Sequence, residues 1–186
     1  MKSKQQIMSP QDIVVLLKII SYGQKPWLQQ QMAEDLHISQ SEISKSLVRC
    51  KFAGLLDAKG KKVFGISLLE FLQYGIKYVF PEQAGAIVRG IPTAHSAMPL
   101  SNIISSEMDY VWPSGKGKRR GQAITPLYPS VVDAVQKDDK LHELLALVDA
   151  IRVGRAREKE IAVKELKDRI LNAPPKSDKR LLLNID

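Results

Sequence analysis

The sequence predicts a mainly α-helical chain with one small β hairpin. Apolar residues recur at three- and four-residue steps through most of the chain, and two short extended runs flank a glycine turn at 54–64. The 186 residues are 44% hydrophobic, which is enough to bury a core. We therefore expect a globular protein with an N-terminal unit over 1–80, a proline- and glycine-rich linking segment over 81–130, a helical segment over 131–172 and a tail over 173–186.

Three helices are expected in the N-terminal unit before the hairpin. The first begins at Pro10, a residue tolerated at the first helical position, and ends before Gly23. The second covers 28–36, and a turn at 37–39 separates it from the third, which covers 40–53. The inward residues are expected to be Leu28, Met32 and Leu36 in the second helix and Ile43, Leu47 and Cys50 in the third.

The outer face of the third predicted helix is polar and basic. Glutamine can bridge the edge of an adenine, serine can donate or accept, and lysine and arginine can contact guanine or phosphate. Two helices joined by a tight turn, with such residues on the second, are typical of a helix-turn-helix that inserts the second helix into the major groove. The candidate DNA-binding residues on this face are Gln40, Ser41, Ser44, Lys45 and Arg49.

The predicted hairpin that follows is also basic. It places Lys59, Lys61 and Lys62 around a glycine turn, directly after the candidate DNA-binding helix. The whole chain has 28 Lys and Arg against 20 Asp and Glu, a formal net charge of +8. Such a balance favours a polyanionic partner, and we expect the three lysines to contact DNA phosphates.

The run from Leu28 to Phe64, with MAEDLHISQSEISKSLVRCKFAGLLD at its centre, resembles winged helix-turn-helix transcription regulators of the MarR-like type. The resemblance implies binding of double-stranded DNA, usually as a homodimer, with Gln40, Ser41, Ser44 and Lys45 at the groove-facing positions. This family commonly has glycine in the turn where the chain has His37, a residue type that tolerates the left-handed backbone better than most. In this family the hairpin after the recognition helix, called the wing, is usually longer than the hairpin predicted here at 54–64.

The middle of the chain is difficult to assign. Residues 81–99 contain three prolines and two glycines and are expected to form a loop, whereas 109–127 are expected to form two short extended segments around a hairpin-like basic loop. That loop is either a solvent-exposed tip or a second contact with nucleic acid. Its basic residues, which have no acidic neighbour in the sequence, are Lys116, Lys118, Arg119 and Arg120, and the aromatic residues beside it are Tyr110, Trp112 and Tyr128.

The segment 131–172 is expected to be helical, starting near Asp138 or Asp139, and to form two helices or one bent helix. It could pack on its own domain or contact a second copy or a partner protein. Three arginines lie where the apolar pattern loosens. They are expected either to lie on a solvated face, paired with Glu158 and Glu160, or to contact DNA phosphates or an acidic partner; they are Arg152, Arg155 and Arg157.

The sequence does not favour catalysis. His37, His95 and His142 do not form a recognisable pair, so we expect no enzyme activity, no metal and no cofactor. Cys50 is expected to be a buried apolar residue rather than a thiol sensor. The sequence has no run of about 18 apolar residues that could cross a membrane, and we expect a cytoplasmic protein.

These observations predict a sequence-specific double-stranded DNA-binding transcription regulator, acting as an autoregulating repressor. The alternative is a protein-interaction module, such as an antitoxin or adaptor, that binds a partner through its C-terminal half. The proline-rich middle and the leucine-rich tail favour that alternative. A third hypothesis is RNA binding through the basic loop at 116–120 and its aromatic neighbours.

Overall fold

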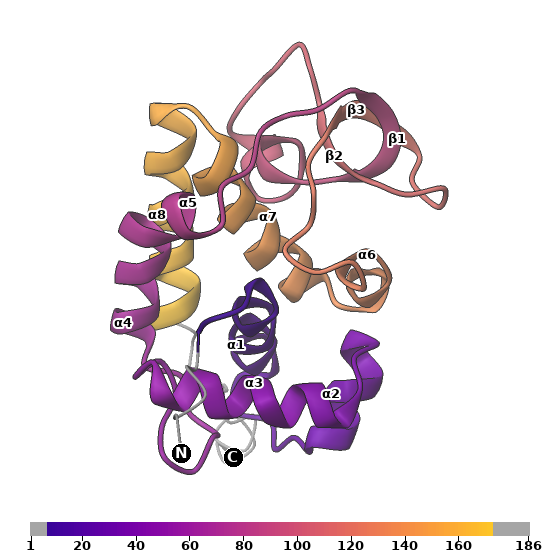
Figure 1. Cartoon of the computed structure of the whole chain (residues 1–186). Helices are drawn as coiled ribbons and strands as arrows, with labels where there is room; N and C mark the ends of the chain where they lie inside the picture. The colour runs from indigo at the N-terminus through magenta and orange to yellow at the C-terminus, as the bar shows by residue number, and fades with distance from the viewer. Residues whose placement is uncertain (1–6, 173–186) are drawn as a thin grey trace, which may run out of the picture.

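A computed structural model describes residues 7–172 of the chain. Helices from the two halves of the sequence pack together, and a small three-stranded sheet lies at one end (Figure 1). The prediction of a mainly helical chain with a small β component is therefore confirmed at this level. The elements are α1 (Pro10–Tyr22), α2 (Gln29–Leu36), α3 (Gln40–Phe52), α4 (Gly65–Glu70), α5 (Ile76–Val79), β1 (Ile87–Pro92), β2 (Tyr110–Pro113), β3 (Arg119–Ala123), α6 (Val131–Ala134), α7 (Asp139–Val153) and α8 (Ala156–Leu171).

Helix α1 is the central helix of the N-terminal half. It begins as predicted, with the Asp12 carboxylate accepting the Ser9 backbone N–H at 2.8 Å, and it ends at Gly23, whose φ of 62° suits glycine. The sequence predicted one buried stripe, but every residue from Gln11 to Ile19 is buried. The reason is that α3 packs on one side of α1 and α7 on another.

Helices α2 and α3 meet at the predicted turn. His37 adopts the left-handed conformation, with φ 52° and ψ 42°, and the Ser39 side chain caps α3 by accepting the Glu42 N–H at 3.2 Å. The predicted inward residues of α3 are buried. Leu28 is the exception to the prediction for the second helix: it precedes α2 as its N-cap residue and leaves 70% of its surface exposed.

The hairpin at 54–64 is short. Leu56 and Val63 form a single antiparallel bridge, and the Phe64 N–H donates to the Leu55 carbonyl at 3.0 Å. After it, α4, a π-helical turn (Phe71–Gly75) and α5 form one continuous helix over 65–79. That helix ends at Val79, just before Pro81, which cannot continue a helix.

The sheet lies in the middle of the chain and corrects two predictions. Strand β1 falls within 81–99, where a loop was expected. It pairs antiparallel with both β2 and β3, which are parallel to each other, so the basic loop between them does not close a hairpin. Gly90 explains the close approach of the strands, because a Cβ there would lie 2.1 Å from the Trp112 carbonyl oxygen.

After the short helix α6 come the two long helices of the C-terminal half, α7 and α8, and α7 is the more deeply buried of them. Every residue from Leu144 to Arg152 is buried, and the Asp138 side chain caps its start by accepting the Leu141 N–H at 2.9 Å. Gly154 separates α7 from α8, which packs against α7 and α4. One hydrophobic core runs through both halves, so residues 131–172 complete the core of the N-terminal unit.

Arg152 lies in this core and not on a solvated face. Its guanidinium donates to the Asp149 carboxylate at 2.7 Å and to the Phe80 carbonyl at 3.0 Å. The same carboxylate accepts from the Thr93 hydroxyl and the Trp112 indole. Both roles considered for Arg152 from the sequence are therefore wrong, because a buried carboxylate needs a cation beside it.

Arg155 and Arg157 are exposed, as the sequence predicted. The Glu158 carboxylate accepts the backbone N–H of Arg155 at 3.0 Å and thereby caps the first turn of α8.

Between residues 7 and 172, no helix is long and apolar enough to span a bilayer.

Candidate nucleic-acid interface

The outer face of α3 is exposed at the edge of the molecule, at the end opposite the sheet (Figure 1). Its first two turns are polar, and Gln40, Ser41 and Ser44 are all exposed there. Further along this face two apolar side chains are exposed: Val48 exposes 44% and Phe52 73% of its surface. Sequence reasoning missed these two residues, although their four-residue spacing from Ser44 places them on the same face.

Lys45 lies on this outer face and is paired within α3. Its ammonium is 2.7 Å from the Glu42 carboxylate, and the hydrogen bond from Lys45 lowers the pKa of Glu42. Both side chains are well exposed, and such surface pairs are weak. Lys45 can therefore exchange this carboxylate for a phosphate at little cost.

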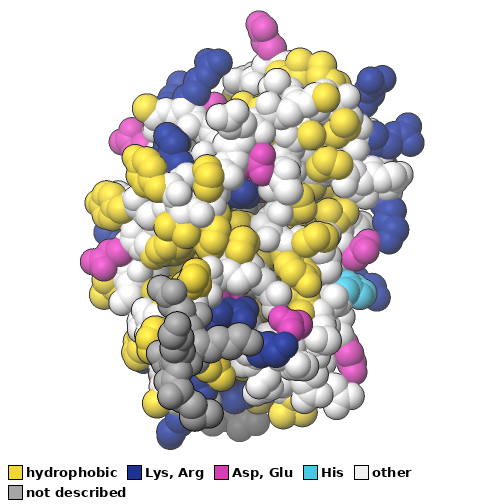
Figure 2. Space-filling view, viewed as in Figure 1, with side chains coloured by type: hydrophobic (Ala, Val, Ile, Leu, Met, Phe, Trp, Pro, Cys, Tyr) yellow, Lys and Arg dark blue, Asp and Glu magenta, His cyan; other side chains and the backbone are white. Residues whose placement is uncertain are grey.

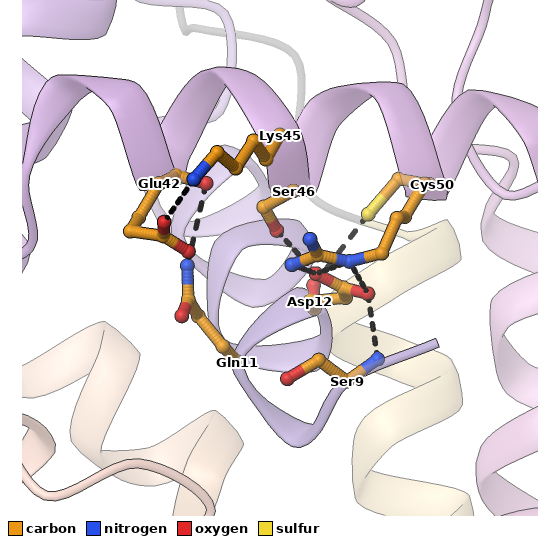
Figure 3. Close-up of polar contacts among 8 residues, drawn as sticks. Ser9, Gln11, Asp12, Glu42, Lys45, Ser46 and Cys50 are labelled. Atoms are coloured by element: carbon orange, nitrogen blue, oxygen red, sulfur yellow. Dashed lines mark hydrogen bonds and ion pairs between the residues drawn. The ribbon is translucent and has the colours of Figure 1, made fainter. Parts of the chain in front are cut away.

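Arg49 points to the inner side of α3. Its guanidinium donates to both Asp12 oxygens, at 2.6 and 2.8 Å, and this hydrogen bonding raises the pKa of Arg49. The Asp12 side chain is fully buried and also accepts the Ser46 hydroxyl at 2.6 Å (Figure 3). The structure thus places Arg49 in the packing of α3 on α1, whereas the sequence pattern had placed it on the DNA-binding face.

The hairpin lysines divide into two kinds. The Lys61 ammonium lies 3.8 Å from the centre of the Trp27 ring and donates to the Trp27 carbonyl oxygen at 2.8 Å. Lys59 and Lys62 are exposed and form no ion pair with any residue of the described range. The hairpin itself is held by Asp57, whose carboxylate accepts the backbone N–H groups of Lys61 and Lys62, and these bonds lower its pKa.

A third exposed lysine, Lys51, belongs with the hairpin. A Cβ added at Gly60 would lie 3.8 Å from the Lys51 Nζ, so this side chain reaches from the end of α3 to the glycine turn. Lys51 is not among the candidates named from the sequence, although its position at the end of the predicted helix is a signal for it. We call Lys51, Lys59 and Lys62 the basic edge.

The second basic surface, around 116–120, lies at the sheet end of the molecule, away from α3 (Figure 1). Its cations do have acidic partners in space: Lys116 is 2.7 Å from Asp133, and Arg119 is 3.2 Å from Asp109. Lys118 and Arg120 remain exposed. Two of the four cations of this loop are therefore already paired with carboxylates.

Two of the three aromatic residues beside that loop, Trp112 and Tyr110, pack against other residues of the fold. Trp112 is buried, and its indole N–H donates to Asp149 at 2.6 Å. Tyr110 is half-buried, with its ring centre 4.5 Å from that of His95. A buried ring cannot stack on a base, so Trp112 does not serve the RNA-binding hypothesis.

The remaining chemically versatile side chains are dispersed. Burial raises the pKa of the Cys50 thiol to about 12, which disfavours the reactive thiolate. His142 contacts the Pro92 carbonyl oxygen at 2.8 Å, and His95 contacts that of Met108 at 2.9 Å. Within 7–172, no group of three His, Cys, Asp or Glu residues is placed to hold a metal ion.

The comparisons with known proteins do not assign a function, so the proposal below rests on the residues described above. No family model, no curated protein and no solved structure matches the chain significantly.

Proposed function

We propose that the chain is a sequence-specific, double-stranded DNA-binding transcription regulator whose N-terminal half is a winged helix-turn-helix. In this proposal α3 is the recognition helix and the hairpin at 54–64 is the wing. The observation that supports it best is the exposed polar face formed by Gln40, Ser41 and Ser44, between the left-handed turn at His37 and the basic edge. N-terminal residues of a recognition helix are those that contact base edges.

Binding would divide between base edges and phosphates. Gln40 is suited to an adenine, which it can contact with both donor and acceptor, and the serines can contact several bases. The three lysines of the basic edge flank the last turn of α3 and would hold phosphates of the adjacent backbone. Arg49 would act indirectly, by fixing α3 on α1 through Asp12.

The regulatory consequence follows from the geometry of the proposed contact. A protein bound in the major groove of a promoter excludes polymerase from that duplex. We propose that the chain represses transcription in this way, and that its own promoter is among its targets.

The proposal is tested by titrating the purified chain against three probes by fluorescence anisotropy. The probes are the duplex upstream of its own coding sequence, a random duplex and a single-stranded RNA of equal length. We expect the upstream duplex to bind more tightly than the others at both about 50 and about 200 mM salt, because counterion release weakens all three but base contacts persist.

Gln40→Ala should weaken binding to the upstream duplex about tenfold or more, as expected for loss of a two-bond contact with a base. It should leave the random duplex unchanged. Gln136→Ala is the matched control, since Gln136 is exposed on the opposite half of the chain. Equal binding of the three probes, or preference for the RNA, would contradict the proposal.

A second candidate function is protein docking, and the apolar end of α3 favours it. Val48 and Phe52 expose apolar surface where phosphates would otherwise be expected to lie. Phe52→Ser separates the two candidates. In the DNA-binding proposal this variant keeps most of its affinity for the duplex, because the last turn of α3 lies away from the bases.

A further inference from the structure

The two arginines of β3 point to different surroundings. Arg119 and Arg120 are neighbours in an extended strand, so their side chains leave opposite faces of it. Arg119 is 3.2 Å from Asp109, and it lines a cavity of about 400 Å³ with His142 and Glu143 of α7. Arg120 is exposed and forms no ion pair with any residue between 7 and 172. The face of β3 turned away from that cavity therefore carries a guanidinium without a described counter-charge.

Arg89 of β1 adds a second guanidinium to this face. The antiparallel register sets Arg89 directly opposite Arg120, and residues directly opposite each other share one face of a sheet. Arg89 is exposed and, like Arg120, forms no ion pair within the described range. The sequence did not point to Arg89, because it lies within 81–99, where a loop was expected. Lys118, directly before β3, is exposed as well, and we call Arg89, Lys118 and Arg120 the sheet cations.

The pairing of Arg89 with Arg120 is unfavourable for the chain alone. Like charges opposite one another on neighbouring strands destabilise a sheet. A carboxylate opposite Arg120 would relieve the repulsion, but β1 places Arg89 there. An anion bound from outside removes this cost, and guanidinium groups pair best with flat or tetrahedral oxyanions, through two parallel hydrogen bonds. The pair is therefore suited to a phosphate.

We infer that the sheet cations bind the phosphate backbone of double-stranded DNA without reading its sequence. The site is exposed, which suits a polymer better than a small phosphate ester, because sites for small ligands are enclosed. A single strand needs exposed rings on which its bases stack. The aromatic residues of the three strands, Trp112 and Tyr110, are buried and half-buried. The choice of DNA over other duplexes rests on the proposed function.

The sheet cations and the proposed recognition helix lie in different parts of the molecule. The sheet is at the end opposite α3 (Figure 1). Figure 2 shows Lys and Arg side chains, in dark blue, along the upper right of the molecule, the side on which β1 and β3 lie in Figure 1. The inferred contact is therefore additional to the one proposed for α3 and the basic edge.

The test is a fluorescence-anisotropy titration of the full chain with the random duplex at a series of salt concentrations. Arg89→Gln/Arg120→Gln should bind this duplex more weakly than wild type. The slope of log affinity against log salt should fall by about 2, since each neutralised phosphate contributes about 0.9. In urea the double variant should be no less stable than wild type, because the change removes a repulsion. A structural role for the pair would lower stability instead.

Arg119→Gln is the matched control, because it makes the same change at the next residue of the same strand, on the other face. It should keep the wild-type salt slope. The inference is overturned if the double variant keeps that slope, or if Arg119→Gln lowers it equally. It is also overturned if single-stranded RNA of equal length binds wild type more tightly than the duplex does and loses this advantage in the double variant.

Failure of this inference can be told apart from failure of the proposed function. The proposed function requires tighter binding to the upstream duplex than to the random duplex, and contacts with phosphates alone do not supply that preference. No preference in wild type, with a lowered slope in the double variant, would remove the proposed sequence reading and keep the sheet cations as a DNA contact. A clear preference with an unchanged slope would do the reverse.

Discussion

The N-terminal half contains two groups of cations that look alike in the sequence. Arg49 and Lys18 are held against acidic side chains in the packing around α1: Arg49 lies against Asp12, and Lys18 lies 2.8 Å from Asp138. The basic edge of Lys51, Lys59 and Lys62 projects into solvent. The difference shows that a basic residue identifies a binding surface only when no buried carboxylate holds it.

The two groups should respond differently to mutation. Removing an interior partner leaves a charge where water cannot solvate it, so stability falls. Removing an exposed lysine changes little in the folded state, so the effect should appear in binding to a polyanion.

The largest effect is expected for Asp12→Ala. The change removes the partner of Arg49 and the acceptor of Ser46, both within the contact between α1 and α3. We expect the free energy of unfolding to fall by about 3–5 kcal/mol, as for other broken buried ion pairs. Urea unfolding followed by circular dichroism measures it.

The control for this prediction is Glu42→Ala, which breaks the exposed pair with Lys45 and should leave stability unchanged. Adding Arg49→Met to Asp12→Ala should recover part of the loss, because the unpaired cation is removed. Equal destabilisation by Asp12→Ala and Glu42→Ala would show that the two faces of α3 do not differ in this way.

A smaller, pH-dependent effect is expected at the contact between α1 and α7. Burial favours the neutral form of Asp138, but the hydrogen bonds from Lys18 and the Leu141 N–H outweigh it and lower its pKa below 3.8. A carboxyl whose pKa is lower in the folded state stabilises the fold above the unfolded pKa, and this contribution is lost as the pH falls through the folded value.

Asp138→Asn should therefore be less stable than wild type at neutral pH and should lose less stability between about pH 5 and pH 2. Asparagine also caps helices, so the start of α7 should be kept. Urea unfolding at a series of pH values measures the difference. Parallel curves for the two proteins would mean that this contact contributes nothing through its charge.

The N-terminal elements were predictable because their signals are local. Pro10, Gly23, the turn at 37–39 and the spacing of Ile43 and Leu47 each act within a few residues of the chain. Strand β1 was not predictable, because it exists only by pairing with β2 and β3 further along the chain. Its glycine looks like a loop signal in the sequence, but Gly90 is what allows β1 to lie close to β2.

The candidate site was predictable in part, for the same reason. The polar positions Gln40, Ser41 and Ser44 follow from helical periodicity, and their exposure agrees with it. The position of the Arg49 guanidinium does not follow from helical periodicity, because its partner Asp12 is 37 residues away in the sequence. Periodicity shows on which face of a helix a residue lies, but it does not show where the charged group of a long side chain is placed.

The smallest effect on stability, and the most informative for function, is expected for the double variant Lys59→Ala/Lys62→Ala. Both lysines are exposed and unpaired within 7–172, so the unfolding curve should match wild type. If they hold phosphates, the slope of log affinity against log salt should fall by about 2, since each neutralised phosphate contributes about 0.9.

Lys61→Ala is the control from the same hairpin. Its ammonium lies on Trp27, so this variant should keep the salt slope and lose slight stability. An unchanged slope in the double variant would remove the hairpin from the DNA interface and leave α3 alone to bind the duplex.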